Sequence, residues 1–119
     1  KVTTVVAAGS AAAPSYNLVG APTAAEYDLN NGHDWSGVLS TTVVNDDPLR
    51  VDTLGDEIVV LLTDGTMRRY YYYASSWSYL SACIVDGKTV MSRNIDCTIP
   101  AGRGFWYVRR GTSALTIQW

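Results

Sequence analysis

The sequence has little charge and no long apolar run. Only 17% of its 119 residues are charged, and the net charge is −2. No uninterrupted apolar stretch approaches the roughly 18 residues that a membrane span needs. The pairs Arg68-Arg69 and Arg109-Arg110 are too small to form the basic surface that nucleic acids or anionic membranes require. These shortages predict a soluble globular domain that binds no nucleic acid and spans no membrane.

Residues suited to catalysis are equally scarce. His33 is the only histidine, Glu26 and Glu57 are the only glutamates, and no G-x-S-x-G nucleophile motif is present. The glycines of residues 100–104 lack the Lys-Ser/Thr pair and the following helix of a phosphate-binding loop. A carboxylate pair for glycoside hydrolysis could be drawn from these glutamates and nine aspartates, but nothing selects one. We therefore expect no enzyme activity, no catalytic residue and no cofactor, and a small hydrolase ranks last.

One polar segment has some features of a metal site. Residues 28–34 place oxygen side chains at alternate positions, and Ca²⁺ favours oxygen ligands. The spacing and the missing downstream glutamate depart from an EF-hand loop, so we predict a hydrogen-bonded loop without metal. Residues 23–26 just before it have capping-box spacing, which predicts at most one short helix, up to Asn30 or Asn31.

Cysteine is limited to Cys83 and Cys97, which flank the Asp86-Gly87 turn. The alternatives are a disulfide and two buried free thiols. A disulfide would close a loop of about fifteen residues and stabilise the fold by roughly 3 kcal/mol in the chain-entropy model. We favour the disulfide because the surrounding sequence is rich in Tyr and Thr and poor in Lys, which predicts an extracellular or cell-surface protein. The chain begins at Lys1 without Met, as a processed chain or a recombinant piece would.

Strand-forming residues are abundant, with eight Tyr and four Trp among them. At the centre lie residues 56–73, two apolar or aromatic runs joined by a turn in which Asp64-Gly65 predicts a β-hairpin. Residues 58–62 show no polar alternation, which predicts a central strand covered on both faces. A two-residue turn would pair Val59 with Tyr70, and a bulge at Gly65 would shift the pairing by one residue. Both registers stay open.

Short apolar or β-branched runs separated by turn signals occur along the whole chain. About eight to ten such strands predict an all-β, single-domain sandwich or barrel of mostly antiparallel strands. Expected strands include residues 16–19, 41–44, 49–54, 82–85 and 105–109. Residues 1–14 are expected to form an N-terminal strand and linker, and residues 15–119 the β-sandwich domain.

The N-terminal run is β-branched and is followed by a linker containing Gly, Ala and Pro. Its strand either forms an edge of its own domain or is donated to a neighbouring copy by pairing across an open sheet edge. The residues that would carry this assembly are Val2, Thr4, Val5 and Val6.

Aromatic residues supply a second set of candidates. Exposed Trp and Tyr rings on a β-sandwich can stack on sugar faces, and cross-strand aromatic pairs can equally serve only to stabilise the sheet. The candidates for aromatic contacts are Trp35, Tyr71, Tyr73, Trp77 and Tyr79.

Four segments share a layout with known proteins. They are Gly55-Asp-Glu-Ile-Val59, Asp64-Gly65 before the tyrosine run, Ser76-Trp77, and Ile99-Pro-Ala-Gly-Arg-Gly-Phe-Trp-Tyr-Val108. Over roughly residues 16–119 the sequence resembles a family of exported, uncharacterised bacterial β-domains. The resemblance implies an exported, surface-associated domain without enzyme activity. The Val-rich N-terminal segment and the two cysteines depart from that layout.

Together these patterns predict a non-catalytic structural subunit of an extracellular or cell-surface, pilus-like fibre. Copies of the chain would assemble by β-strand complementation through the N-terminal strand. The alternative is a carbohydrate-binding or adhesin module that contacts a glycan or a host or cell surface through exposed Tyr and Trp.

Overall fold

A computed structural model describes residues 3–10, 12–20, 26–30, 34–36, 55–73 and 75–118, with the backbone alone for 34–36. Within these ranges the fold is all-β with short antiparallel strands, as predicted, and no helix is present. The described part of the chain accordingly holds no helix long and apolar enough to cross a membrane. The strands predicted at residues 41–44 and 49–54 lie outside the described residues.

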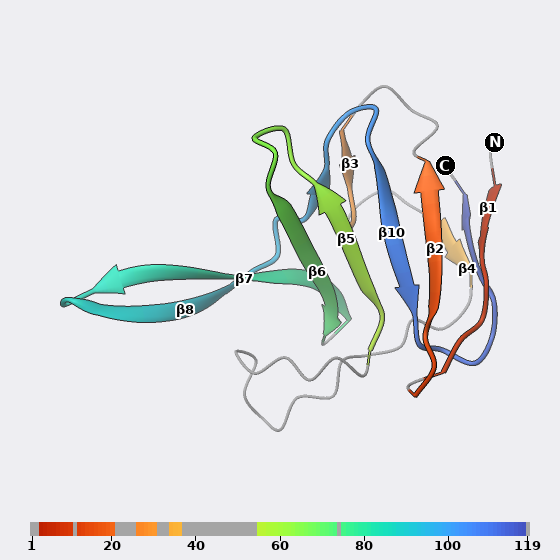
Figure 1. Ribbon diagram of the computed structural model, residues 1–119, viewed down its shortest axis with the longest axis horizontal. Coiled ribbons are helices and arrows are strands. Elements are labelled where there is room, and N and C mark those ends of the chain that lie inside the picture. Colours follow the sequence, from red (N-terminus) through yellow and green to blue (C-terminus); the bar gives the residue numbers. More distant parts are fainter. Residues whose placement is uncertain are drawn as a thin grey trace.

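The main sheet has six strands in the order β2-β10-β5-β6-β7-β8 (Figure 1). Their bounds are β2 Ser15–Gly20, β10 Gly104–Arg109, β5 Glu57–Leu61, β6 Met67–Tyr73, β7 Ser76–Val85 and β8 Lys88–Asn94. Because β5 lies between β10 and β6, the predicted central position of residues 58–62 is confirmed. The predicted cover on both faces is not found among the described residues, since Ile58 and Val60 are buried but Leu61 on the opposite face is exposed.

Two smaller sheets complete the described fold. A three-stranded sheet has the order β1-β11-β4, and β3 pairs with β9. Their bounds are β1 Thr3–Val6, β11 Leu115–Gln118, β4 Asp34–Ser36, β3 Tyr27–Asp28 and β9 Thr98–Ile99. The helix predicted up to Asn30 is wrong over its described part. Tyr27 instead pairs with Ile99, and the buried Leu29 donates its backbone N–H to the Cys97 carbonyl at 2.9 Å, so sheet pairing overrides the capping-box spacing.

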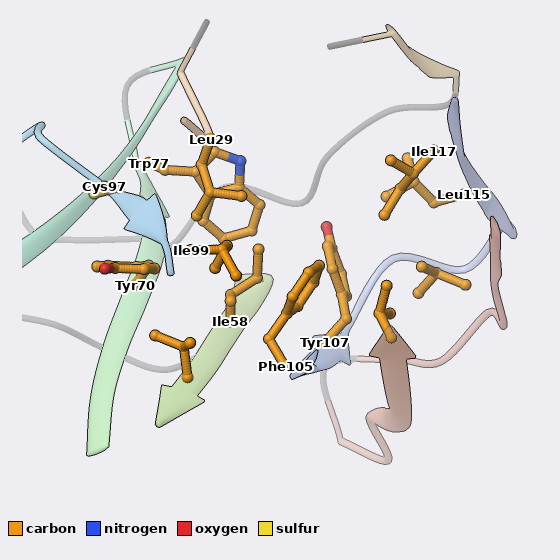
Figure 2. Close-up of a cluster of buried hydrophobic side chains, with 13 residues drawn as sticks. Leu29, Ile58, Tyr70, Trp77, Cys97, Ile99, Phe105, Tyr107, Leu115 and Ile117 are labelled. Carbon is orange, nitrogen blue, oxygen red and sulfur yellow. The ribbon is translucent and has the colours of Figure 1, made fainter. Parts of the chain in front are cut away.

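Side chains from the two larger sheets fill one core (Figure 2). The main sheet contributes Val19, Ile58, Val60, Tyr70, Trp77, Phe105 and Tyr107, and the three-stranded sheet contributes Val6, Leu115 and Ile117. The sheets therefore pack face to face as a sandwich. This arrangement leaves the other side of the main sheet, here called the outer face, away from the core.

The β5–β6 hairpin has the shifted register. Ile58 pairs with Tyr70, one residue away from the pairing that a two-residue turn would give. Gly65 has a φ of +87° and donates its backbone N–H to the Leu62 carbonyl at 3.0 Å. A positive φ of this kind favours glycine, and it allows the bulged three-residue loop that sets the register.

The tyrosine run divides between the two faces of the sheet. Tyr70 is buried and donates its hydroxyl to the Thr98 carbonyl at 2.7 Å, and the Tyr72 ring lies 5.4 Å from the Trp77 ring. Tyr71 and Tyr73 point the other way because successive strand residues alternate. Half of the run therefore belongs to the core.

β7 and β8 extend beyond the body of the domain as a two-stranded arm (Figure 1). β7 pairs with β6 only over residues 76–78, and beyond them it pairs with β8 alone. Asp86 and Gly87 have φ values of +51° and +74° and form the predicted two-residue turn. Every residue from 82 to 92 is exposed. These eleven residues are called the arm below.

The N-terminal strand β1 pairs with β11 of the same chain, with Val6 opposite Leu115. Val6 is buried, Thr4 is half-buried and Val5 is exposed, whereas Val2 lies outside the described residues. Of the two alternatives drawn from the sequence, the structure contains the edge strand of its own domain.

The disulfide predicted between Cys83 and Cys97 is not formed, and both are free thiols. Cys83 lies in the arm opposite Val90, four residues beyond the pair of Tyr79 and Asn94 at its base. Four strand residues span about 13 Å, and Cys97 is buried in the core and not in the arm. A disulfide needs Cα atoms within roughly 7 Å of each other. Burial, with help from nearby acidic groups, raises the pKa of the Cys97 thiol to about 12, so it stays protonated and unreactive. This correction removes the cysteine argument for an extracellular location.

Candidate ligand-binding groove

The outer face carries an exposed indole on β10. In β10, Phe105 and Tyr107 are buried in the core, and Trp106 between them faces outward and is 44% exposed. The sheet register places Trp106 beside Leu18 of β2 and Val59 of β5. Strand alternation thus brings a large aromatic side chain to an open part of the surface.

A groove of about 450 Å³ lies on this face across β2, β10, β5 and β6. This volume is within the range of roughly 300–1,000 Å³ found for small-molecule sites. Its lining residues are Tyr16, Glu57, Val59, Arg69, Trp106, Val108 and Arg110. Tyr16 is 67% exposed, so the groove has two accessible aromatic rings.

Sheet pairing arranges these residues in two neighbouring rows across the strands. One row contains Leu18, Trp106, Val59 and Arg69. The other contains Tyr16, Val108, Glu57 and Tyr71. Among the lining residues of the groove, the aromatic side chains come from β2 and β10, and the charged ones from β5 and β6 and from Arg110 just after β10.

Glu57 is the buried carboxylate of the groove, with 3% of the residue exposed. Its Oε1 accepts a hydrogen bond from Nη1 of Arg110 at 2.9 Å, and its Oε2 lies 3.3 Å from Nε of Arg69. Nη1 of Arg110 also donates to the Gly55 carbonyl at 2.8 Å. Because a buried charge is costly unless it is paired, these contacts hold the Glu57 carboxylate in place.

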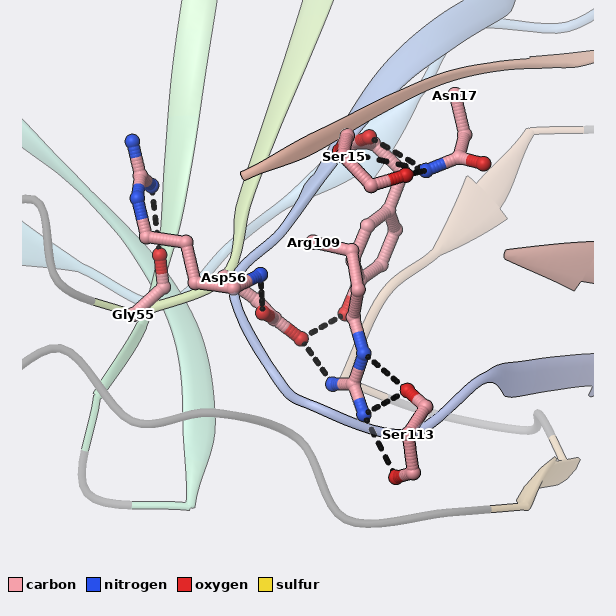
Figure 3. A network of polar contacts seen from close by, with 8 residues as sticks. Ser15, Asn17, Gly55, Asp56, Arg109 and Ser113 are labelled. Carbon is pink, nitrogen blue, oxygen red and sulfur yellow. Dashed lines mark hydrogen bonds and ion pairs between the residues drawn. The ribbon is translucent and has the colours of Figure 1, made fainter. Parts of the chain in front are cut away.

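Asp56 supports the groove from the core side of the sheet (Figure 3). Its Oδ2 accepts hydrogen bonds from the Tyr107 hydroxyl at 2.7 Å and from Nη1 of Arg109 at 2.6 Å. Its Oδ1 accepts the backbone N–H of Arg110 at 2.8 Å. Nη2 of Arg109 donates to the Ser113 carbonyl at 2.9 Å. Burial and the adjacent carboxylate raise the pKa of Tyr107 well above its ordinary value, so its hydroxyl remains a donor.

The structure does not bring the predicted aromatic contact residues to one surface. Trp77 is fully buried in the core, so its assignment as an exposed contact is wrong. Tyr71 and Tyr79 line a second hollow of about 270 Å³ between β6 and β7, and Tyr73 is half-buried. Trp35 lies in β4, where the backbone alone is described.

The sequence analysis missed Tyr16 and Trp106 as contact residues. A signal for Trp106 was present, because alternation along residues 104–109 separates it from Phe105 and Tyr107. The pattern does not say which face of the strand is covered. Only the position of the three-stranded sheet identifies the open side.

The polar loop predicted at residues 28–34 is hydrogen-bonded over its described part. Asn30 donates its backbone N–H to Oδ1 of Asp28 at 2.9 Å. Its side-chain amide donates to the carbonyls of Trp77 and Ile95 at 2.9 and 2.7 Å and accepts the Trp77 backbone N–H at 2.8 Å. No group of three or more metal-ligating side chains occurs in the part of the chain that the structure describes, and His33 lies outside it.

Comparisons with protein-family models, curated proteins and solved structures find no match to this chain. The resemblance to exported bacterial β-domains therefore stays a prediction. What the groove can bind follows from its own residues.

Proposed function

We propose that the protein is a carbohydrate-binding module whose groove holds an oligosaccharide against Trp106. The observation that carries the proposal is an accessible indole, with Tyr16 in the neighbouring row, beside paired charges. The C–H faces of sugar rings pack on aromatic rings, and sugar hydroxyls need hydrogen-bond partners. The groove offers both kinds of contact within one hollow.

The charges in the groove favour binding over hydrolysis. Glycosidases use two carboxyl groups about 5 to 9.5 Å apart. Glu57 is the single carboxylate among the described lining residues, and Arg69 and Arg110 already contact both of its oxygens. We therefore propose a role in binding without catalysis.

Trp106→Ala is expected to weaken glycan binding by at least about tenfold, because an aromatic anchor at the centre of a site carries much of its affinity. A glycan array would identify a ligand, and calorimetric titration would compare the dissociation constants of the wild type and the variant. Trp106→Phe should keep part of the affinity because it retains an aromatic face.

Ile84→Ala is a matched control, since Ile84 is 77% exposed but lies in the arm, outside the groove. Its affinity should equal that of the wild type. A wild type that binds no glycan, or an unchanged affinity in Trp106→Ala, would contradict the proposal.

The arm favours a second candidate function, a structural subunit of a fibre built from copies of this chain. Its exposed apolar residues include Ile84, Val85, Val90 and Met91. A two-stranded hairpin is marginally stable alone in water, and contact with a neighbouring copy would cover these side chains. Exchange of β1 between copies is a further mode of assembly, because residues 7–14 link this edge strand to the main sheet.

Negative-stain microscopy of concentrated protein tests this second candidate with Ile84→Lys and Val5→Asp, two exposed positions in different elements. Loss of filaments in Ile84→Lys alone indicates assembly through the arm. Loss in Val5→Asp alone indicates exchange of β1. A monomeric wild type at high concentration rules out the fibre, and circular dichroism checks that both variants fold.

A further inference from the structure

The groove has the opposite charge to the chain as a whole. Among the described residues, two guanidinium groups, Arg69 and Arg110, and one carboxylate, Glu57, line it, which gives these residues one net positive charge. The whole chain has a net charge of −2. A local excess of positive charge beside aromatic rings favours a ligand that carries negative charge.

Arg69 is the guanidinium best placed to meet such a ligand. Its side chain is 52% exposed, whereas that of Arg110 is almost buried. Its contact with Glu57 uses Nε at 3.3 Å, and its two terminal amino groups make no contact among the described residues. A guanidinium presents paired N–H donors that match the two oxygens of a carboxylate.

The sheet register sets the distance between the indole and this guanidinium. Trp106 and Arg69 stand in the same row, with Val59 between them. Neighbouring strands are about 4.8 Å apart, so the two residues are separated by roughly 10 Å at the backbone. This spacing suits two linked sugar rings, one against Trp106 and the next at Arg69.

We infer that the groove binds an acidic oligosaccharide of uronic acid units, with a ring carboxylate paired to Arg69. The inference rests on the proposed function. It adds the class of sugar and the residue that selects it. Trp106 supplies affinity for any sugar with an apolar face, and Arg69 supplies the preference for the acidic one.

Calorimetric titration with trigalacturonate and with its trimethyl ester tests the inference, because the two probes have the same sugar rings and differ at the carboxyl groups, which are ionised in the acid and methylated in the ester. The wild type should bind the acid about 10- to 100-fold more tightly than the ester, since a hydrogen bond to a charged group is worth about that factor. Raising the salt concentration should reduce this preference, because Arg69 is exposed to solvent. Arg69→Gln should remove it, so that the acid and the ester bind this variant with equal affinity.

Arg103→Gln is the matched control, since Arg103 lies in the turn before β10 and does not line the groove. It should keep the full preference for the acid. Equal affinities for acid and ester in the wild type, both lost in Trp106→Ala, would overturn the inference and leave the proposed function standing. Array binding restricted to neutral glycans would also overturn it, and a wild type that binds no glycan at all overturns both.

Discussion

Asp56→Ala is expected to lower the free energy of unfolding by about 3–5 kcal/mol, the usual effect of removing one partner of a buried ion pair. The variant leaves the Arg109 guanidinium, itself almost fully buried, without the carboxylate that lies 2.6 Å away. It also removes the acceptors of the Tyr107 hydroxyl and of the Arg110 backbone N–H. Urea denaturation followed by tryptophan fluorescence measures the change.

Two further variants show whether the loss of stability comes from the broken ion pair or from the loss of any aspartate. Asp96→Ala, at an exposed position, should change the free energy of unfolding by no more than about 0.5 kcal/mol. Adding Arg109→Met to Asp56→Ala should recover part of the lost stability, because the buried guanidinium that lost this carboxylate is then removed as well. A loss below about 1 kcal/mol in Asp56→Ala would show that water or local rearrangement satisfies Arg109 instead.

Trp77→Ala is expected to destabilise the domain by about 3–5 kcal/mol, as large aromatic-to-alanine changes in cores do. The Trp77 ring lies 5.4 Å from Tyr72 and 5.8 Å from Tyr107, both in edge-to-face geometry. Truncation would therefore leave a cavity between β6, β7 and β10. Thermal unfolding monitored by circular dichroism would record the loss.

Trp106→Ala provides the comparison within the same chain. It also replaces a tryptophan by alanine, but on the outer face, where the side chain is partly exposed. The loss of stability should therefore be clearly smaller than in Trp77→Ala. The two substitutions should thus have different effects: Trp77→Ala should mainly lower stability, and Trp106→Ala should mainly lower the affinity for the ligand. Equal destabilisation by both variants would mean that the outer face is as closely packed as the core.

The turns were the most predictable part of this fold. Asp64-Gly65 and Asp86-Gly87 both form hairpins, because glycine with positive φ is required at each and is placed there by the sequence. The sequence does not determine the hairpin register at Gly65, since the same dipeptide occurs in a two-residue turn and in a bulged loop. Only the pairing of Ile58 with Tyr70 decides between them.

The orientation of aromatic residues relative to the core could not be predicted from local pattern. Trp77 and Trp106 both lie in aromatic strands, yet one is buried and the other faces outward. Alternation fixes which residues share a face, and the packing of a distant sheet decides which face is covered. For this reason the sequence alone does not reveal the groove, although it contains Glu57 and Arg69.

The disulfide failed as a prediction for a related reason. Cys83 lies in a run of strand-forming residues whose pattern is typical of a core strand, but this run forms part of an exposed arm. The sequence spacing between Cys83 and Cys97 does not show that a hairpin extends away from the domain between them. The length of an unsupported hairpin is a property of the tertiary fold.

Asp56 and Glu57 are consecutive, as are Arg109 and Arg110, and each pair divides its side chains between the two faces of one sheet. Substitution of either groove member of these pairs would therefore also affect the packing inside the sandwich. Tyr16, Leu18, Leu61 and Met67 are exposed on the outer face and have no such partner in the core. A library of binding variants could be diversified at these four positions at little cost in stability, while Glu57 and the arginines paired with it are kept unchanged.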